Sequence, residues 1–332
     1  MKSLIQKLVE TVGPSGNEKG VRDLVRAEIA DYVDEIKVDA MGNLIARKGK
    51  KEANGMRIML AAHIDEIGVI ATYVDENGFV RFTSIGGVYP AYCIGGRVTF
   101  LNGTKGVING DRLETPGTLP KLDQLYIDVG ATSPADCPVK VGDMATFERP
   151  FVDLGNRLVS KAMDDRIGVA VMIETLKQFQ TSPHEIYFVF STQEEVGTRG
   201  ATTAAYSIDP EIGISVDVTL TGDTPKGVKM AVSLGKGPAI KVRDGGMLSD
   251  PRLVQQMILA AEKANLPYQL EVLEGGTTDA RAMQISRAGM SAGCVSIPCR
   301  YVHSPSEMVD YSDVQNAIKL LLSLLSNPII LE

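Results

Sequence analysis

The sequence contains no apolar stretch close to the length that a membrane crossing requires. A helix needs about 20 apolar residues to span a bilayer, and polar residues interrupt each apolar run of this chain well before that. A basic cluster is also missing, because 34 Lys and Arg face 41 Asp and Glu, for a formal net charge of −7. An acidic chain without a basic patch has no surface that attracts nucleic acid or an anionic membrane. We therefore expect neither as a partner.

Cysteine and histidine are scarce. The four cysteines (Cys93, Cys137, Cys294 and Cys299) have no spacing typical of a zinc site. They suit a reducing compartment in which thiols stay free. Polar residues interrupt the N-terminus too early for a signal-peptide core, so we expect a cytoplasmic protein. The sequence has only 3 histidines, so that each can be judged individually.

The order of helix and strand patterns predicts an α/β protein with an insertion. Apolar residues make up 44% of the chain and charged residues 23%, as in ordinary globular enzymes, and the length suits about two domains. Residues 1–67 and 151–332 alternate between the two patterns and predict one discontinuous α/β catalytic domain. Residues 68–150 lack helical periodicity and show short strands between glycine-rich turns, which predicts an inserted all-β domain. Residues 112–122 of this insertion are expected to form a loop.

Apolar periodicity predicts the individual elements. Ser15 or Asn17 is expected to cap the second helix, and Asp250 to cap a helix with Pro251 at its first position. We expect helices over residues 2–11, 17–30, 167–179 and 250–263, and from 312 or 313 onward. We expect a hairpin of 33–38 with 44–46, and strands over 57–62, 157–160, 186–190, 212–216, 229–234, 239–242, 269–272 and 291–297.

The buried strand at 186–190 leads into two adjacent carboxylates, Glu194 and Glu195, and then Gly197. Adjacent side chains on an extended chain point in different directions. One of the two can therefore bind a metal ion while its neighbour serves as a proton-transfer base. Open α/β sheets place their sites at the carboxyl ends of parallel strands. The alternative is a strand end followed by two solvated glutamates.

Residues of the types that bind metal ions stand at the ends of several core strands or shortly after them. Two imidazoles and three carboxylates suit a pair of divalent ions, zinc or cobalt. If one carboxylate bridges, each ion receives three protein ligands, and the two ions share a water molecule at a separation of ~3.5–4 Å. The candidate ligands are His63, Asp164, Glu195, Asp217 and His303.

Each candidate also has a simpler interpretation. The two histidines could be hydrogen-bonded core residues, Asp164 a helix cap and Asp217 a turn residue. Convergence of all five on one site favours ligands, and Asp164 is expected both to bridge the ions and to lie near a helix N-terminus. Asp65 could accept the second ring N–H of His63, which would fix the tautomer. His184 is expected at the surface.

Five segments together resemble the tetrahedral (TET-type) metallo-aminopeptidases. They are His-Ile-Asp-Glu at 63–66, Lys-Ala-Met-Asp-Asp-Arg at 161–166, Gln-Glu-Glu-Val-Gly at 193–197, Val-Asp at 216–217 and Tyr-Val-His-Ser at 301–304. The resemblance covers essentially the whole chain. The family includes glutamyl and deblocking aminopeptidases, and some of its members carry the name cellulase or endoglucanase.

The resemblance implies a role for each site residue. One metal ion would be held by His63 and Asp217 and the other by Glu195 and His303, with Asp164 bridging. Glu194 would be the general base and Asp65 the hydrogen-bond partner of His63. Asp165 receives no catalytic role, because the family also allows Asn there. Thr278 and Asp279 are candidates for shaping the substrate pocket, with a glycine-rich turn that caps the next helix as the alternative.

The resemblance also implies fold and assembly. The catalytic domain would have the mixed-sheet, phosphorylase/hydrolase-like fold of zinc peptidases, and the insertion would be a small PDZ-like dimerisation domain. Dimers would assemble into a hollow dodecameric tetrahedron.

The expected activity is removal of N-terminal residues from short peptides by a metal-activated water. Glu194 would take the proton of that water and deliver it to the leaving amine. The alternatives are a metallohydrolase of another amide, such as a deacylase or deacetylase, and a glycosidase, which needs a carboxylate pair but no dinuclear site. A structural metal site is a third alternative, although such sites are usually rich in cysteine. The preferred N-terminal residue, the native metal and the extent of assembly stay open at this point.

Overall fold

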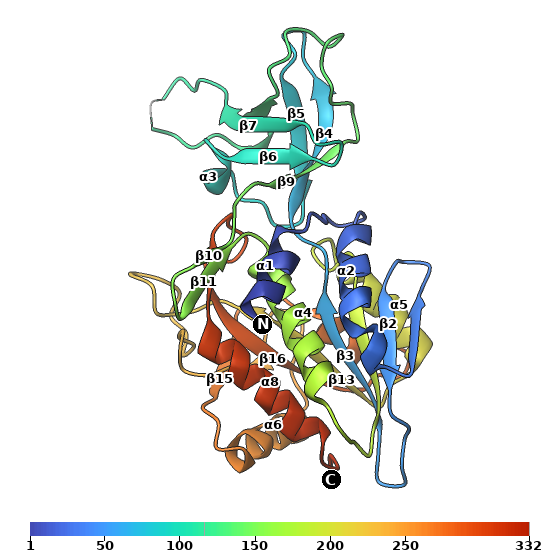
Figure 1. Cartoon of the computed structure of the whole chain (residues 1–332). Coiled ribbons are helices and arrows are strands. Elements are labelled where there is room, and N and C mark those ends of the chain that lie inside the picture. The colour runs from blue at the N-terminus through green and yellow to red at the C-terminus, as the bar shows by residue number, and fades with distance from the viewer. Residues whose placement is uncertain (116, 332) are drawn as a thin grey trace.

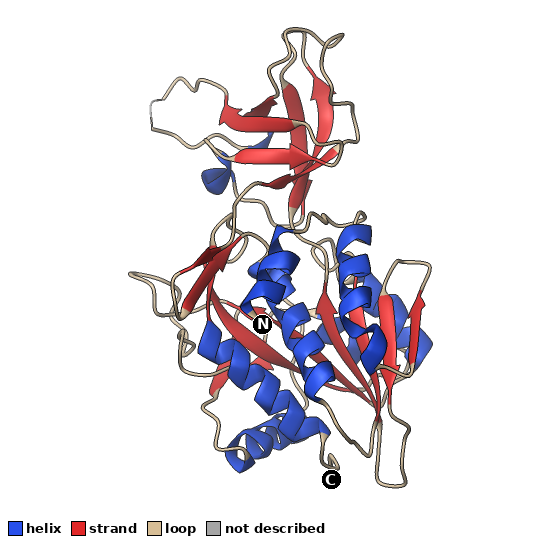
Figure 2. Ribbon diagram, viewed as in Figure 1, coloured by secondary structure: helices blue, strands red, loops and turns tan. Residues whose placement is uncertain are grey.

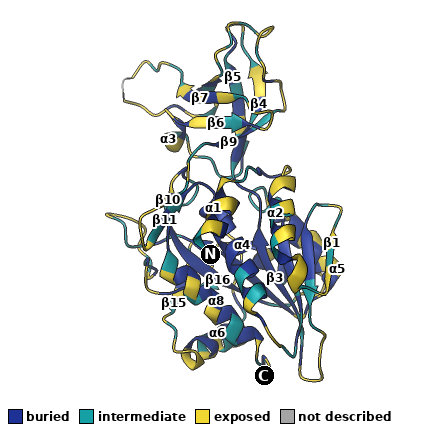
Figure 3. Ribbon diagram, viewed as in Figure 1, coloured by how far each residue is buried: buried dark blue, intermediate teal, exposed yellow. Residues whose placement is uncertain are grey.

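Four parallel strands form the centre of a mixed sheet. They lie in the order β12 (Glu185–Ser191), β3 (Arg57–His63), β13 (Ile212–Thr219) and β16 (Ser291–Arg300). Every residue of β13 is buried, as in parallel sheets that are covered on both faces. Figure 3 shows this buried centre in dark blue. The computed structural model describes residues 1–115 and 117–331, so the expected loop at 112–122 includes one position, 116, that lies outside the described residues.

Antiparallel strands complete the sheet, which contains 11 strands in the described part of the chain. The expected hairpin is confirmed, since β1 (Glu35–Val38) pairs with β2 (Leu44–Lys48) beside β12. On the other side lie β17 (Glu307–Asp310), β11 (Arg157–Ser160) and β10 (Val152–Asp153). β14 (Ala239–Arg243) pairs antiparallel with β16, and β15 (Gln269–Val272) pairs parallel with β14. The predicted α/β class with a mixed sheet is thus confirmed.

Helices cover both faces of the sheet (Figure 2). Alternate residues of β3 face opposite ways: Ile58 and Leu60 join the larger hydrophobic core, whereas Met59 and Ala61 join a smaller one. The smaller core is covered by α5 (Arg199–Ile208) and α7 (Asp279–Gln284). The larger core is covered by α1 (Lys2–Glu10), α2 (Lys19–Ile29), α4 (Met163–Gln178), α6 (Pro251–Lys263) and α8 (Tyr311–Leu325). Each helix of the described residues is too short or too polar to cross a bilayer.

The β-rich segment closes on itself. Its strands pair antiparallel in a barrel of the order β4-β5-β8-β7-β6-β9 with a hydrophobic core of its own. Figure 1 shows this barrel at the top of the view, above the body that contains the main sheet. Two of its strands are connected through the short helix α3 (Pro90–Cys93), which periodicity did not predict. The strands are β4 (Gly68–Val74), β5 (Val80–Ile85), β6 (Arg97–Phe100), β7 (Lys105–Gly110), β8 (Leu125–Asp128) and β9 (Met144–Phe147). Single 3-10 turns occur at Ala30–Tyr32 and Leu122–Gln124.

Two local expectations are wrong, and some elements were not predicted. Residues 229–234 form no strand, because their hydrogen bonds go to loops and side chains, such as Ser233 N–H to the Gln269 side chain at 2.9 Å. Glu18, rather than Ser15 or Asn17, stands at the N-cap of α2 and provides no side-chain cap. Helix α5 and strand β17 were not predicted, and α7 was anticipated only as the helix that the alternative interpretation of Thr278 and Asp279 would cap. Asp250 caps α6 as expected by accepting the backbone N–H of Arg252.

His184 is fully buried, contrary to the expected surface position. Its Nδ1 accepts the backbone N–H of Met56 at 3.0 Å, and its Nε2 lies 2.9 Å from the carbonyl oxygen of Asn327. Burial lowers the pKa of this imidazole, so that the neutral ring is favoured. His184 therefore ties the start of β3 to the segment that follows α8.

Candidate active site

The five candidate ligands lie together at the carboxyl end of the parallel strands. His63 is the last residue of β3, and Asp217 lies within β13, the neighbouring strand. Glu195 follows β12 and His303 follows β16 in the chain, while Asp164 lies in the first turn of α4. The strand order therefore brings together residues that are up to 240 positions apart in the sequence (63 and 303). This is the edge at which open α/β sheets place their sites.

Asp164 lies between the two histidines. Its Oδ1 is 2.9 Å from Nε2 of His63, and its Oδ2 is 3.3 Å from Nε2 of His303. Glu195 Oε2 also lies 3.3 Å from Nε2 of His303. Ligand atoms within 4.8 Å of one another form two groups, His63 with Asp164 and Asp217, and Asp164 with Glu195 and His303. Asp164 is common to both groups.

Buried negative charge accumulates at this site. Burial raises the pKa of Asp217 and of Glu195, and the Asp164 charge raises both further. Burial also acts to raise the pKa of Asp164, but hydrogen bonds from both imidazoles outweigh it and lower that pKa. In the described residues no Lys or Arg forms an ion pair with these three carboxylates, and Oε1 of Glu195 is buried without a hydrogen-bond partner. The donor set, whose three carboxylates have no Lys or Arg partner among the described residues, therefore fits divalent cations.

The orientation of the His63 ring also suits metal binding. Its Nδ1 lies 3.1 Å from the backbone carbonyl oxygen of Asp65 and 3.5 Å from the Oδ1 of that residue. A carbonyl oxygen can only accept, so Nδ1 carries a proton, and Nε2 is the ring nitrogen that faces Asp164 and would bind the metal ion. The nearer partner of the ring is thus the main chain of Asp65 rather than its carboxylate.

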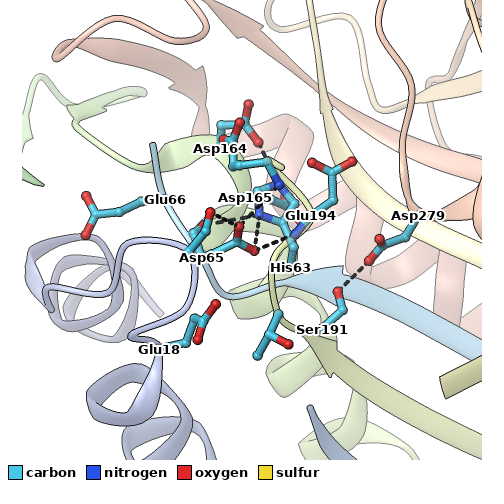
Figure 4. Close-up of polar contacts among 12 residues, drawn as sticks. Glu18, His63, Asp65, Glu66, Asp164, Asp165, Ser191, Glu194 and Asp279 are labelled. Atoms are coloured by element: carbon cyan, nitrogen blue, oxygen red, sulfur yellow. Dashed lines mark hydrogen bonds and ion pairs between the residues drawn. The ribbon is translucent and has the colours of Figure 1, made fainter. Parts of the chain in front are cut away.

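The Asp65 carboxylate instead holds the segment that follows β12. Its Oδ1 accepts the backbone N–H of Glu194 at 3.0 Å, and its Oδ2 accepts that of Glu195 at 3.2 Å. Ser15 donates its hydroxyl to the same Oδ2 at 2.6 Å. Figure 4 shows Asp65 beside His63, with Glu194 close by. Asp65 therefore connects β3, the Glu194–Glu195 turn and the loop that precedes α2.

Glu194 extends into the cavity without an ion-pair partner among the described residues. Burial raises its pKa well above the ordinary value, and the charges of Asp217 and Asp279 raise it further, although His63 acts in the opposite direction. A carboxylate with a raised pKa is a stronger base than a solvated one.

Thr278 and Asp279 have different surroundings. Thr278 lines the cavity and caps α7, because its Oγ1 accepts the backbone N–H of Ala280 at 3.3 Å. Asp279 is buried behind it and accepts the Ser191 hydroxyl, as Figure 4 shows. Burial raises the pKa of Asp279 to about 6. The cap therefore agrees with the simpler interpretation of Thr278, although its side chain still borders the cavity.

The cavity has a volume of about 680 Å³ and is lined by the five candidate ligands and by mixed side chains such as Leu220, Leu273 and Arg281. Sequence reasoning missed the contribution of the barrel: Tyr89 lines the cavity, and its ring centroid lies 6.4 Å from that of His303. A Cβ at Gly87 would come within 2.3 Å of Nδ1 of His303, so that only glycine fits there. The Gly86-Gly87 pair is the feature of the sequence that could have indicated this close approach of the backbone to His303.

Comparison with protein families identifies the fold around this cavity. The family described as M42 glutamyl aminopeptidase matches residues 42–320. The chain belongs to the M42 glutamyl aminopeptidase family. The predicted resemblance to the tetrahedral aminopeptidases is therefore confirmed, and aminopeptidase is the activity that the family supports.

Individual relatives agree with the assignment to M42. The chain is 37% identical to the lysyl aminopeptidase of Pyrococcus furiosus, with 97% of this chain and 96% of that protein covered. An aminopeptidase from the archaeon Desulfurococcus kamchatkensis has a TM-score of 0.93 at 39% identity, over 98% of this chain and 94% of that one. The TET1 peptidase of Pyrococcus horikoshii, which can assemble into a tetrahedron or a large octahedral shell, has a TM-score of 0.88 at 32% identity, over 98% of both chains.

Proposed function

We propose that this chain is a dinuclear metal-dependent aminopeptidase that removes N-terminal residues from short peptides. One observation carries the proposal: Asp164 belongs to both three-residue groups of potential ligands, one with His63 and the other with His303. A carboxylate shared in this way is what a pair of metal ions needs as a bridge.

The roles follow from this arrangement. His63 and Asp217 would hold one ion, Glu195 and His303 the other, and Asp164 would bridge. Two divalent ions, zinc or cobalt, would supply an activated water and a Lewis acid for the scissile carbonyl. The donor set of two imidazoles and three carboxylates suits either metal.

Proton transfer is assigned to Glu194. It would take a proton from the attacking water and give it to the leaving amine. Its position in the cavity and its raised pKa support this role. Asp65 would act indirectly, by holding the backbone of Glu194 and Glu195 and orienting His63 through its carbonyl group.

The pocket residues have secondary roles. Thr278 would shape the part of the cavity that receives the substrate. Asp279 would hold the neighbouring backbone in place by accepting the hydroxyl of Ser191. The free α-amino group of the peptide would bind beside the metal ligands, which would restrict cleavage to the first residue.

We further propose a domain division and an assembly. Residues 1–67 and 151–332 would form the catalytic domain, of the zinc-peptidase type, and residues 68–150 an inserted, PDZ-like dimerisation domain. The separate barrel core and exposed apolar side chains such as Leu101 and Val141 support this role. The tetrahedral assembly of the TET1 relative supports dodecamers built from dimers, and the four free cysteines suit the expected cytoplasmic location.

A substrate panel tests the proposal. Aminoacyl-p-nitroanilides and short peptides are assayed with defined zinc or cobalt, alongside the same compounds with an acetylated N-terminus. Cleavage that requires both the free amine and the metal is the expected result. Preference for the N-acyl compounds would instead indicate a deacylase, and turnover of glycosides that survives chelation would indicate a glycosidase.

A further inference from the structure

Glu307 makes two contacts that connect the candidate ligands. It is the first residue of β17 and is buried. Its Oε2 accepts the backbone N–H of Asp164 at 2.9 Å, and its Oε1 accepts the backbone N–H of His303 at 2.8 Å. Each carboxylate oxygen is thus used by the main chain of a different candidate ligand, and Glu307 itself belongs to neither ligand group.

The backbone of Glu307 is itself fixed. Glu307 pairs with Ser160 where β17 runs antiparallel to β11. β11 leads directly into α4, which carries Asp164. The carboxylate therefore extends from a rigid strand rather than from a loop, as precise positioning requires.

His303 depends on such a restraint more than the other candidates do. It lies in a turn beyond β16, and its φ of +62° is in the left-handed region that non-glycine residues seldom adopt. A residue keeps this conformation only where its surroundings enforce it. Among its neighbours, Glu307 accepts the His303 N–H and Gly87 leaves space for the ring.

We propose that Glu307 is a positioning residue that sets the separation and orientation of Asp164 and His303. The inference rests on the proposed function. Glu307 would then act on one side of the site as Asp65 acts on the other. The two oxygens of Asp65 accept the N–H groups of Glu194 and Glu195. Two buried carboxylates would then hold, through the main chain, both Glu194 and three of the five ligands.

The test is metal binding by Glu307→Gln. The amide keeps the size of the side chain, but its NH2 group would face a backbone N–H, so that one of the two hydrogen bonds is lost. Losing a group that supports a ligand typically weakens metal affinity about 10- to 100-fold. We expect a loss of this size in cobalt titrations followed by visible absorption, together with a changed absorption spectrum.

Asp313 offers a matched control. It is also buried, and its two oxygens accept the backbone N–H groups of Gly235 and Gly237 at 2.7 Å each. Asp313→Asn should lower stability and leave cobalt affinity and spectrum unchanged. Equal weakening by this variant would overturn the proposal, because a general loss of stability would then explain both results.

A second variant covers the case in which Glu307→Gln does not fold, as judged by circular dichroism. Glu307→Asp keeps the charge but is one carbon shorter, so it cannot reach both N–H groups and should weaken cobalt binding in the same direction. Wild-type affinity and spectrum in the folded Glu307 variants would refute the inference alone. If the unmodified protein and Asp164→Ala bind cobalt equally, the proposed dinuclear site fails instead.

Discussion

The backbone N–H of Glu194 donates a 3.0 Å hydrogen bond to Oδ1 of Asp65. This bond joins the residue that we propose as the base to the end of β3, only two positions after His63. Asp65 is fully buried and also accepts the N–H of Glu195 and the hydroxyl of Ser15. The direction of Glu194 is therefore set by an acidic side chain that does not itself line the cavity.

Replacing Asp65 should accordingly reduce both stability and turnover. Asp65→Ala leaves two backbone N–H groups without their acceptor, at a cost of about 1–3 kcal/mol for each buried unsatisfied group. Urea unfolding and kcat measured on the same preparation check this. Ser15→Ala removes only one donor and should have a smaller effect on both quantities. A kcat of the unmodified size in folded Asp65→Ala would contradict the positioning role.

Glu194→Gln should separate metal binding from catalysis. The amide cannot accept the proton of the water, and a general base contributes about 10²- to 10⁴-fold to the rate. We therefore expect kcat to fall by that factor while metal content, measured by mass spectrometry, stays at the unmodified level. Glu274→Gln provides the control, because Glu274 lines the same cavity but is exposed. Ordinary turnover by Glu194→Gln would rule out its role as the base.

Loss of Asp164 should affect both metal ions, whereas loss of Asp217 should affect one. Only Asp164 belongs to both candidate ligand groups. We predict that Asp164→Ala loses most of both ions after dialysis against metal-free buffer, and that Asp217→Ala retains about one ion per chain. Equal stoichiometry in the two variants would argue against a bridge.

His184 should make stability depend on pH. Burial lowers the pKa of His184 in the folded protein below the ordinary value of 6.5. A lowered histidine pKa means that the unfolded chain binds the proton more readily, so this contribution to stability is present above pH 6.5 and is lost as the pH falls below it. His184→Ala leaves the Met56 N–H without its acceptor and should cost about 1–3 kcal/mol at pH 8. Urea unfolding from pH 8 to pH 5 should show that difference shrinking, and a constant difference would contradict a neutral buried ring.

The parts of this fold that depend on local pattern could be predicted from the sequence. The run at 186–190 and the hairpin beside it show the apolar pattern of buried strands, and both occur as β12 and β1–β2. Acidic and imidazole side chains at strand ends point to a shared edge of the sheet, so the candidate ligands could be selected before their distances were known.

The parts that depend on tertiary contacts could not be predicted. Residues 229–234 have the alternating apolar and polar pattern of a strand, but in the part of the chain that the structure describes they pair with no neighbouring strand. His184 is polar and follows a proline, and only its two backbone partners make burial favourable. Glu307 resembles any solvated glutamate in the sequence, and its two bonds depend on the meeting of β17, α4 and the His303 turn. Tyr89 reaches the cavity from the barrel, at a place that no spacing predicts.

The most direct test of the dinuclear site is a metal titration of the chelator-stripped protein, with activity followed on one aminoacyl-p-nitroanilide. Zinc or cobalt is added in known amounts, and bound metal per chain is measured at each point by mass spectrometry. The site described here predicts two ions per chain, and activity that is absent without metal and reaches its maximum at the second ion. Full activity in the stripped protein, or saturation of binding and activity at one ion per chain or fewer, would contradict it.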